Sequence, residues 1–155
     1  NSGVTGKVIV GSGVTIDQNN IDAGHVTGIV TAKSYVGGGD GKLVTAEWTL
    51  GANANNHYTL TGPGGLSNAD DPTIYLARGQ TYQFVNNSGG THPFQIRQSA
   101  GGSAYTTGVT YAGGGSSASA GVIRFEVPFA APNTLVYQCT SHGSMVGNIV
   151  VYPSI

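Results

Sequence analysis

The feature that most restricts the fold of this chain is a series of short β-type runs without any helical periodicity. No segment repeats apolar residues at the i, i+3, i+4, i+7 spacing for three turns, which a helix packed on a core would show. Instead, short runs rich in β-branched and aromatic residues are bounded by Gly, Asn, Asp and Pro. About eight such runs within residues 44–152 predict an antiparallel β-sandwich.

The expected strands follow one another at intervals that are typical of sandwich domains. They lie in VTAEWTL (Val44–Leu50), HYTLTG, both halves of PTIYLARGQTYQFVNN, THPFQIR, GVIRFEVP (Gly121–Pro128), TLVYQC (Thr134–Cys139) and GNIVVY (Gly147–Tyr152). Between the fifth and sixth runs lies SAGGSAYTTGVTYAGGGSSASAG. Its Gly, Ser and Ala content predicts a long, partly mobile loop.

Residues 1–43 differ from the remainder of the chain. Val-Thr-Gly occurs at Val4–Gly6 and again at Val26–Gly28, within segments too rich in glycine to bury a face alone. We therefore predict a boundary near Gly41–Val44, with a β-structured stalk or an oligomerisation or attachment segment over residues 1–43 and one domain over residues 44–155. A flexible leader is the alternative for the first part.

Composition excludes several classes of function. Only 8% of the residues are charged and the net charge is −1, so bulk charge gives no affinity for nucleic acid or an anionic membrane. The apolar runs are too short for a membrane span, and one cysteine excludes an internal disulfide. The chain begins at Asn1, as expected of a processed product or a piece of a longer chain.

Three metal-ligating residue types cluster near the end of the chain. Cys139 ends an expected strand, and His142 and Met145 follow at intervals of three residues. A loop leaving the strand could curl these side chains around one point, and His92 at the start of another strand offers a fourth ligand. A thiolate, two imidazoles and a weak thioether form a soft trigonal set that selects copper for electron transfer. Taken singly, each residue has a plainer interpretation as a core filler or a surface group.

These residues resemble those of the cupredoxins, the blue-copper β-sandwich family. YQCTSHGSM is similar to the C-terminal ligand loop of the small blue copper proteins, with a short spacing nearest to that of the amicyanins, and ARGQTYQFVNNSGGTHPFQI is similar to the segment that leads to their first histidine. The resemblance covers residues 44–152 and implies a Greek-key cupredoxin-like sandwich, preceded here by a short β segment rich in Gly, Val and Thr. It also implies type 1 copper, with His92, Cys139 and His142 as equatorial ligands and Met145 as the axial one.

Two departures from the family pattern bear on function. Most small cupredoxins have an Asn after the first histidine, and its backbone N–H bonds to the thiolate, whereas Pro93 has no N–H to offer. His-Pro-Phe also occurs in multicopper oxidases, but only His25 and His57 remain for the further ligands that those enzymes need. No other catalytic constellation is evident in the sequence, so we expect a protein that is not an enzyme.

The first segment carries a second resemblance, to Val-Thr-Gly-rich units in structural proteins of marine bacteriophages, especially phages of cyanobacteria. This implies a copper-binding module in an extracellular or virion assembly, such as a phage surface or fibre. The module would be attached through residues 1–43 to copies of the chain or to a neighbouring structural protein. The alternatives are a free electron carrier of the periplasm or cell surface, with a redox partner near His142, and a purely structural sandwich without metal.

Overall fold

The computed structural model describes residues 14–16, 21–23 and 44–153, and the chain divides into two units, Asn1–Tyr35 and Val36–Ile155. In the first unit, β1 (Val14–Ile16) pairs antiparallel with β2 (Ile21–Ala23). Most of the predicted stalk lies outside the described residues, so the stalk and its boundary near Val44 stay predictions. Within the described part of the chain, no helix is long and apolar enough to cross a membrane.

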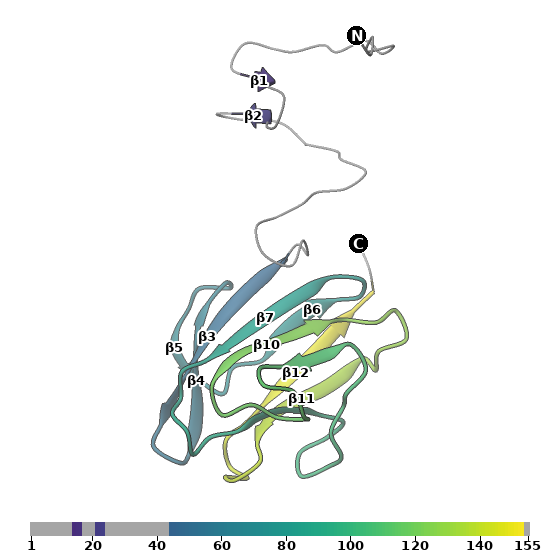
Figure 1. The fold of residues 1–155 in the computed structure, drawn as a ribbon. Coiled ribbons are helices and arrows are strands. Elements are labelled where there is room, and N and C mark those ends of the chain that lie inside the picture. Colours follow the sequence, from purple (N-terminus) through teal and green to yellow (C-terminus); the bar gives the residue numbers. More distant parts are fainter. Residues whose placement is uncertain (1–13, 17–20, 24–43, 154–155) are drawn as a thin grey trace. The chain divides into compact units, whose positions relative to one another are not determined.

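The second unit is a sandwich of two β-sheets (Figure 1). One sheet has the strand order β5-β4-β3-β7-β10-β9, and the other has the order β6-β12-β11-β8. The prediction of an all-β sandwich is therefore confirmed. The strands are β3 (Ala46–Asn53), β4 (His57–Gly62), β5 (Leu66–Asp70), β6 (Ile74–Ala77), β7 (Thr81–Asn86), β8 (Phe94–Arg97), β9 (Val109–Tyr111), β10 (Gly121–Glu126), β11 (Thr134–Cys139) and β12 (Val146–Tyr152).

The structure adds detail that the sequence pattern did not contain. Most neighbouring strands are antiparallel, but β3 pairs parallel with β7 and β6 pairs parallel with β12, so both sheets are mixed. Strands β5 and β9 were not expected. The long loop predicted after β8 contains β9, and isolated bridges join Ala104 to Arg97 and Ala118 to Phe94. Much of that loop is therefore held against the sandwich.

The core lies between the sheets and follows the two-residue period of the strands. Along β7, Tyr82, Phe84 and Asn86 are buried while the residues between them are partly exposed. Strand β11 differs because every residue after Thr134 is buried, so both of its faces are covered. The buried Asn86 ends β7, and the buried Cys139 ends β11. Both lie at the end of the sandwich where the predicted metal ligands are found.

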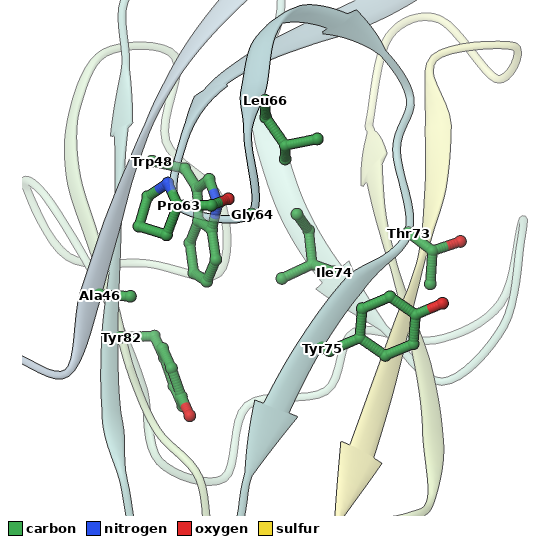
Figure 2. A pocket seen from close by; sticks show the side chains of 9 residues that line it. All are labelled: Ala46, Trp48, Pro63, Gly64, Leu66, Thr73, Ile74, Tyr75 and Tyr82. Atoms are coloured by element: carbon green, nitrogen blue, oxygen red, sulfur yellow. The ribbon is translucent and has the colours of Figure 1, made fainter.

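An open pocket of about 360 Å³ lies between the two sheets (Figure 2). Trp48 and Tyr82 line one side of it, and Leu66 and Ile74 line the other. Tyr82 lies near the beginning of β7, whereas His92, a predicted metal ligand, contacts Asn86 at the end of that strand. The pocket is thus separate from the candidate metal centre.

Candidate metal centre

The pairing of β8 with β11 brings two distant parts of the sequence together. Cys139, the last residue of β11, lies opposite Phe94, the first residue of β8. His92 precedes Phe94 by two residues, so this antiparallel register places it beside the cysteine. The chain then turns back after Cys139, and His142 lies in the loop that leads to β12.

His92, Cys139 and His142 form one cluster in which the three potential ligand atoms lie within 4.8 Å of one another. The two histidine Nδ1 atoms are 3.2 Å apart, and His142 Nδ1 is 3.6 Å from Cys139 Sγ. The structure thus brings together the three residues predicted as equatorial ligands. His92 and Cys139 are buried, while His142 is half-buried and is the member of the cluster that reaches furthest toward solvent.

The environment of His92 favours its neutral imidazole. Burial lowers the pKa of His92, and the neighbouring His142 lowers it further. A neutral imidazole has a free lone pair for a metal ion, whereas a protonated one has none. The His92 Nδ1 atom, 3.2 Å from His142 Nδ1, is therefore suited to binding a cation.

The ligand loop is closed by its own backbone. The Cys139 N–H donates to the Met145 carbonyl at 3.0 Å, and the Met145 N–H donates to the His142 carbonyl at 3.1 Å. The Thr140 N–H donates to the Pro93 carbonyl at 2.9 Å, which ties this loop to the segment that carries His92. Met145 is fully buried at the end of the loop. Its role as the axial ligand stays a prediction.

Gln138 fastens the same loop from its other side, a role that the sequence analysis missed. Its Nε2 donates to the Gly143 carbonyl at 2.8 Å, and its Oε1 accepts from the Gly101 N–H at 2.8 Å and from Arg97 at 3.2 Å. Because this buried amide has three hydrogen-bond partners, it fixes the ligand loop at Gly143 and also the loop that contains Gly101. The available sequence signal was a polar residue beside Cys139 in an otherwise apolar strand.

Asn86 and Tyr58 hold the His92 segment, and the sequence analysis missed these roles as well. The His92 carbonyl accepts from Asn86 Nδ2 at 3.1 Å and from the Tyr58 hydroxyl at 2.9 Å. Asn86 also donates to the Ala118 carbonyl at 2.8 Å, while its Oδ1 accepts from the Ser88 N–H at 3.0 Å. Asn86 alternates with Tyr82 and Phe84 along β7, so the two-residue period could have marked it as a buried polar group.

His57 does not join the cluster. Its Nδ1 lies 2.7 Å from Asp71 Oδ2, at the start of β4. Burial raises the pKa of Asp71, and the hydrogen bonds from His57 and from the Tyr58 N–H oppose that effect. His57 is therefore paired elsewhere, and His25 lies outside the described residues. Among the residues that the structure describes, the cluster contains two histidines, His92 and His142.

The donor set of the cluster fits type 1 copper. One cysteine sulfur and two imidazole nitrogens supply the trigonal ligands of such a site, and a methionine thioether is the usual weak fourth ligand. The three ligand atoms lie close enough to share one ion and come from a strand end and a loop that hydrogen bonds fix in place. Zinc also accepts Cys and His ligands but adopts a tetrahedral geometry.

Comparisons with known proteins find similarity only among solved structures. No family model and no curated protein matches the chain. A purple cupredoxin from Nitrosopumilus maritimus is 18% identical over 69% of this chain and 99% of that one, with a TM-score of 0.42. Rusticyanin from Thiobacillus ferrooxidans is 18% identical over 69% and 75% of the two chains, with a TM-score of 0.39. A reduced Cu(I) amicyanin variant is 22% identical over 52% and 70%, with a TM-score of 0.36.

Proposed function

We propose that residues 44–155 form a copper-binding module that carries single electrons. The observation that carries this proposal is the convergence of His92, Cys139 and His142 within 4.8 Å at one end of a β-sandwich. Bound copper supplies one-electron chemistry because it cycles between Cu(II) and Cu(I). A donor protein would give the electron and an acceptor protein would take it, so the module itself makes and breaks no covalent bond.

The surrounding residues support this function by keeping the ligands in one arrangement. The backbone hydrogen bonds of Cys139, Thr140 and Met145 close the ligand loop, and the contacts of Asn86 and Tyr58 hold the His92 carbonyl. A ligand set that is fixed before the metal binds changes little between oxidation states, which favours fast electron transfer.

The exposed edge of His142 is the proposed place for exchange with a redox partner. His142 is half-buried, and the adjacent Ser141, Gly143 and Ser144 are exposed, small and uncharged. A partner could approach this part of the loop without displacing a charged or bulky side chain. Electrons would then pass through the imidazole, since the cysteine and the first histidine are buried.

The setting of the module depends on residues 1–43. We propose attachment through this segment, to copies of the chain or to a neighbouring structural protein, in an extracellular or virion assembly such as a phage surface or fibre. The support for this setting is the Val-Thr-Gly-rich sequence alone. A free carrier of the periplasm or cell surface is the second candidate, and the half-buried His142 suits it equally well.

Titration of the metal-free protein with Cu(II) tests the proposed function. We expect one equivalent to produce an intense visible band, because a Cu(II)–thiolate bond in this geometry absorbs strongly. Metal analysis after dialysis should find one copper per chain. A protein that stays colourless with Cu(II), or that retains zinc alone when both metals are offered, would contradict the proposal.

A chain that starts at Val44 is expected to keep its fold and its copper colour. The four predicted ligands and strands β3–β12 all lie beyond that point. If residues 1–43 mediate attachment, the shortened chain should lose self-association that the full chain shows in light scattering. A full-length protein that is monomeric, with residues 1–43 exchanging their amide hydrogens as fast as a random coil, would favour the free carrier.

A further inference from the structure

Strand β6 lies at one edge of its sheet, and part of its outer side has no bonded neighbour among the described residues. On its other side it pairs in parallel with β12. The Arg78 N–H donates to the Tyr152 carbonyl at 3.1 Å, which identifies the residues whose backbone groups face β12. Because alternate residues of a strand direct these groups to opposite sides, Tyr75, and Thr73 just before the strand, direct theirs away from β12.

The rest of this edge is closed, so the outward backbone groups of Thr73 and Tyr75 form a short open edge. Beyond them, the Ala77 N–H donates to the Tyr82 hydroxyl at 2.9 Å, and the Ala77 carbonyl accepts from the Gln80 N–H at 3.3 Å. The opposite edge of the sheet, β8, is covered by bridges from the long loop that follows it. Unpaired N–H and C=O groups at a sheet edge are a ready site for a further strand.

The open edge borders the apolar pocket between the sheets (Figure 2). Thr73, Ile74 and Tyr75 line one side of this pocket, and Trp48 and Leu66 lie across it. Ile74 points into the pocket, whereas the Tyr75 ring points away from it, over β12. None of the residues that line the pocket is charged. A strand added beside β6 would therefore bond to the open edge and place an apolar side chain in the pocket, as in recognition by β-strand addition.

The chain contains a run that fits this site, in the segment outside the described residues. Val8–Val10 is the only stretch of three consecutive valine or isoleucine residues within residues 1–43. In a strand, Ile9 faces one side and its two neighbours face the other. Ile9 can thus enter the pocket while the backbone groups of its neighbours face the open edge. A small apolar molecule would fill the pocket but leave the open edge unbonded, so a polypeptide is the better occupant.

We propose that Val8–Val10 of one copy adds to β6 of a second copy as an antiparallel strand. Val8 lies opposite Tyr75 and Val10 lies opposite Thr73, and each of these pairs exchanges two backbone hydrogen bonds. Ile9 enters the pocket, which removes apolar surface from water. The inference rests on the attachment through residues 1–43 in the proposed function, and it names the surface that receives the segment.

The inserted run and the open edge are different surfaces, so the contact is heterologous. Each copy inserts its run into one neighbour and receives a run from another. Such a contact produces rings or open chains of copies rather than closed pairs. We therefore expect the full-length protein to form assemblies that grow with concentration in light scattering.

A complementation experiment with two full-length variants tests the contact. Ile9→Asp puts a carboxylate into the pocket but keeps the open edge. Thr73→Pro removes an outward N–H that the fold does not use and keeps the inserted run. Each variant alone should remain a single chain, and their equimolar mixture should form complexes of two chains and no larger ones. The matched controls Val8→Asp, whose side chain lies outside the pocket, and Thr73→Val, which keeps the N–H, should assemble like the wild type.

A cross-link tests the register and does not depend on how Thr73→Pro folds. Hydrogen-bonded antiparallel pairs have Cα atoms about 5.5 Å apart, which is within the range for a disulfide. Val10→Cys mixed with Thr73→Cys should therefore form a disulfide-linked pair on oxidation. The control is Val10→Cys mixed with Val122→Cys, because Val122 is 41% exposed on β10 of the other sheet. Cys139 is buried and common to all these chains.

The outcomes separate this inference from the proposed attachment. If the chain that starts at Val44 loses the assembly but Thr73→Pro keeps it, attachment through residues 1–43 stands and the site on β6 is overturned. Equal cross-linking of Val10→Cys with Thr73→Cys and with Val122→Cys would also overturn the site. A full-length protein that stays monomeric at every concentration would contradict both the inference and the attachment to copies of the chain.

Discussion

Replacement of Cys139 by Ser is expected to abolish the visible absorption of the Cu(II)-loaded protein. A serine hydroxyl is harder than a thiol and does not ionise near neutral pH, so it cannot form the covalent copper–sulfur bond that gives the colour. The side chain is only 2% exposed and lies at the end of β11. Serine is smaller and polar, so we also expect a modest loss of stability in the metal-free form.

The control for this substitution is Met145→Leu. Met145 is fully buried, and leucine has a similar volume, so the change in packing should be small. If Met145 is the weak axial ligand, this variant keeps an intense band but changes its reduction potential. Absorption spectra and voltammetry of the two variants, prepared side by side, test both assignments. A coloured Cys139→Ser protein would show that the chromophore lies elsewhere in the chain.

The cluster and the fold could be predicted because they depend on local patterns. Cys139 and His142 are three residues apart, at a strand end and in the loop that follows it, so the local chain can bring their side chains together. His92 could be added because it begins a recognisable strand, and the pairing of β8 with β11 brings it beside Cys139. The two-residue alternation of β7 and the apolar run of β11 are equally visible in the sequence.

Strand β5 could not be predicted because its sequence carries little strand signal, and β9 could not be predicted because it has only three residues. Strand β5 contains Leu66 as its one large apolar residue, and its pairing with β4 includes a register irregularity at Leu60–Gly62. Strand β9 has three residues inside a Gly- and Ser-rich segment and forms because β10 offers it a partner edge. In both cases a neighbouring strand determines the structure, and a single sequence does not contain that information.

The residues that support the ligands were also hidden, for a different reason. Tyr58 and Asn86 contact the His92 carbonyl, which lies 34 and 6 residues away in the sequence. Gln138 contacts the Gly143 carbonyl, five residues away. Their residue types are common and form no motif. Each is a buried polar side chain whose partner becomes apparent only when the sheets are assembled. The supporting contacts can therefore be identified only from the folded structure, whereas the ligands could be predicted from the sequence.

Phe94 links the stability of the core to the metal centre, so its replacement by Ala is expected to have the largest effect on folding. The ring is fully buried, with centroids 5.3 Å from Phe84, 5.6 Å from Tyr58 and 5.7 Å from Tyr137. Truncating such a residue typically costs about 3–5 kcal/mol, through lost burial and the cavity left behind. The whole stability of a domain is only about 5–15 kcal/mol.

Denaturant unfolding of the metal-free protein is the appropriate measurement, because bound metal would stabilise the native state by mass action. Phe129→Ala is the control, since its ring is 72% exposed and its loss should change stability by no more than about 0.5 kcal/mol.

Phe94 pairs with Cys139 and follows His92 by two residues, so the cavity left by its ring also makes the distance between these two predicted ligands less fixed. We therefore expect Phe94→Ala to bind copper more weakly than Phe129→Ala. A loss of stability below about 1 kcal/mol would mean that the core does not close around Phe94.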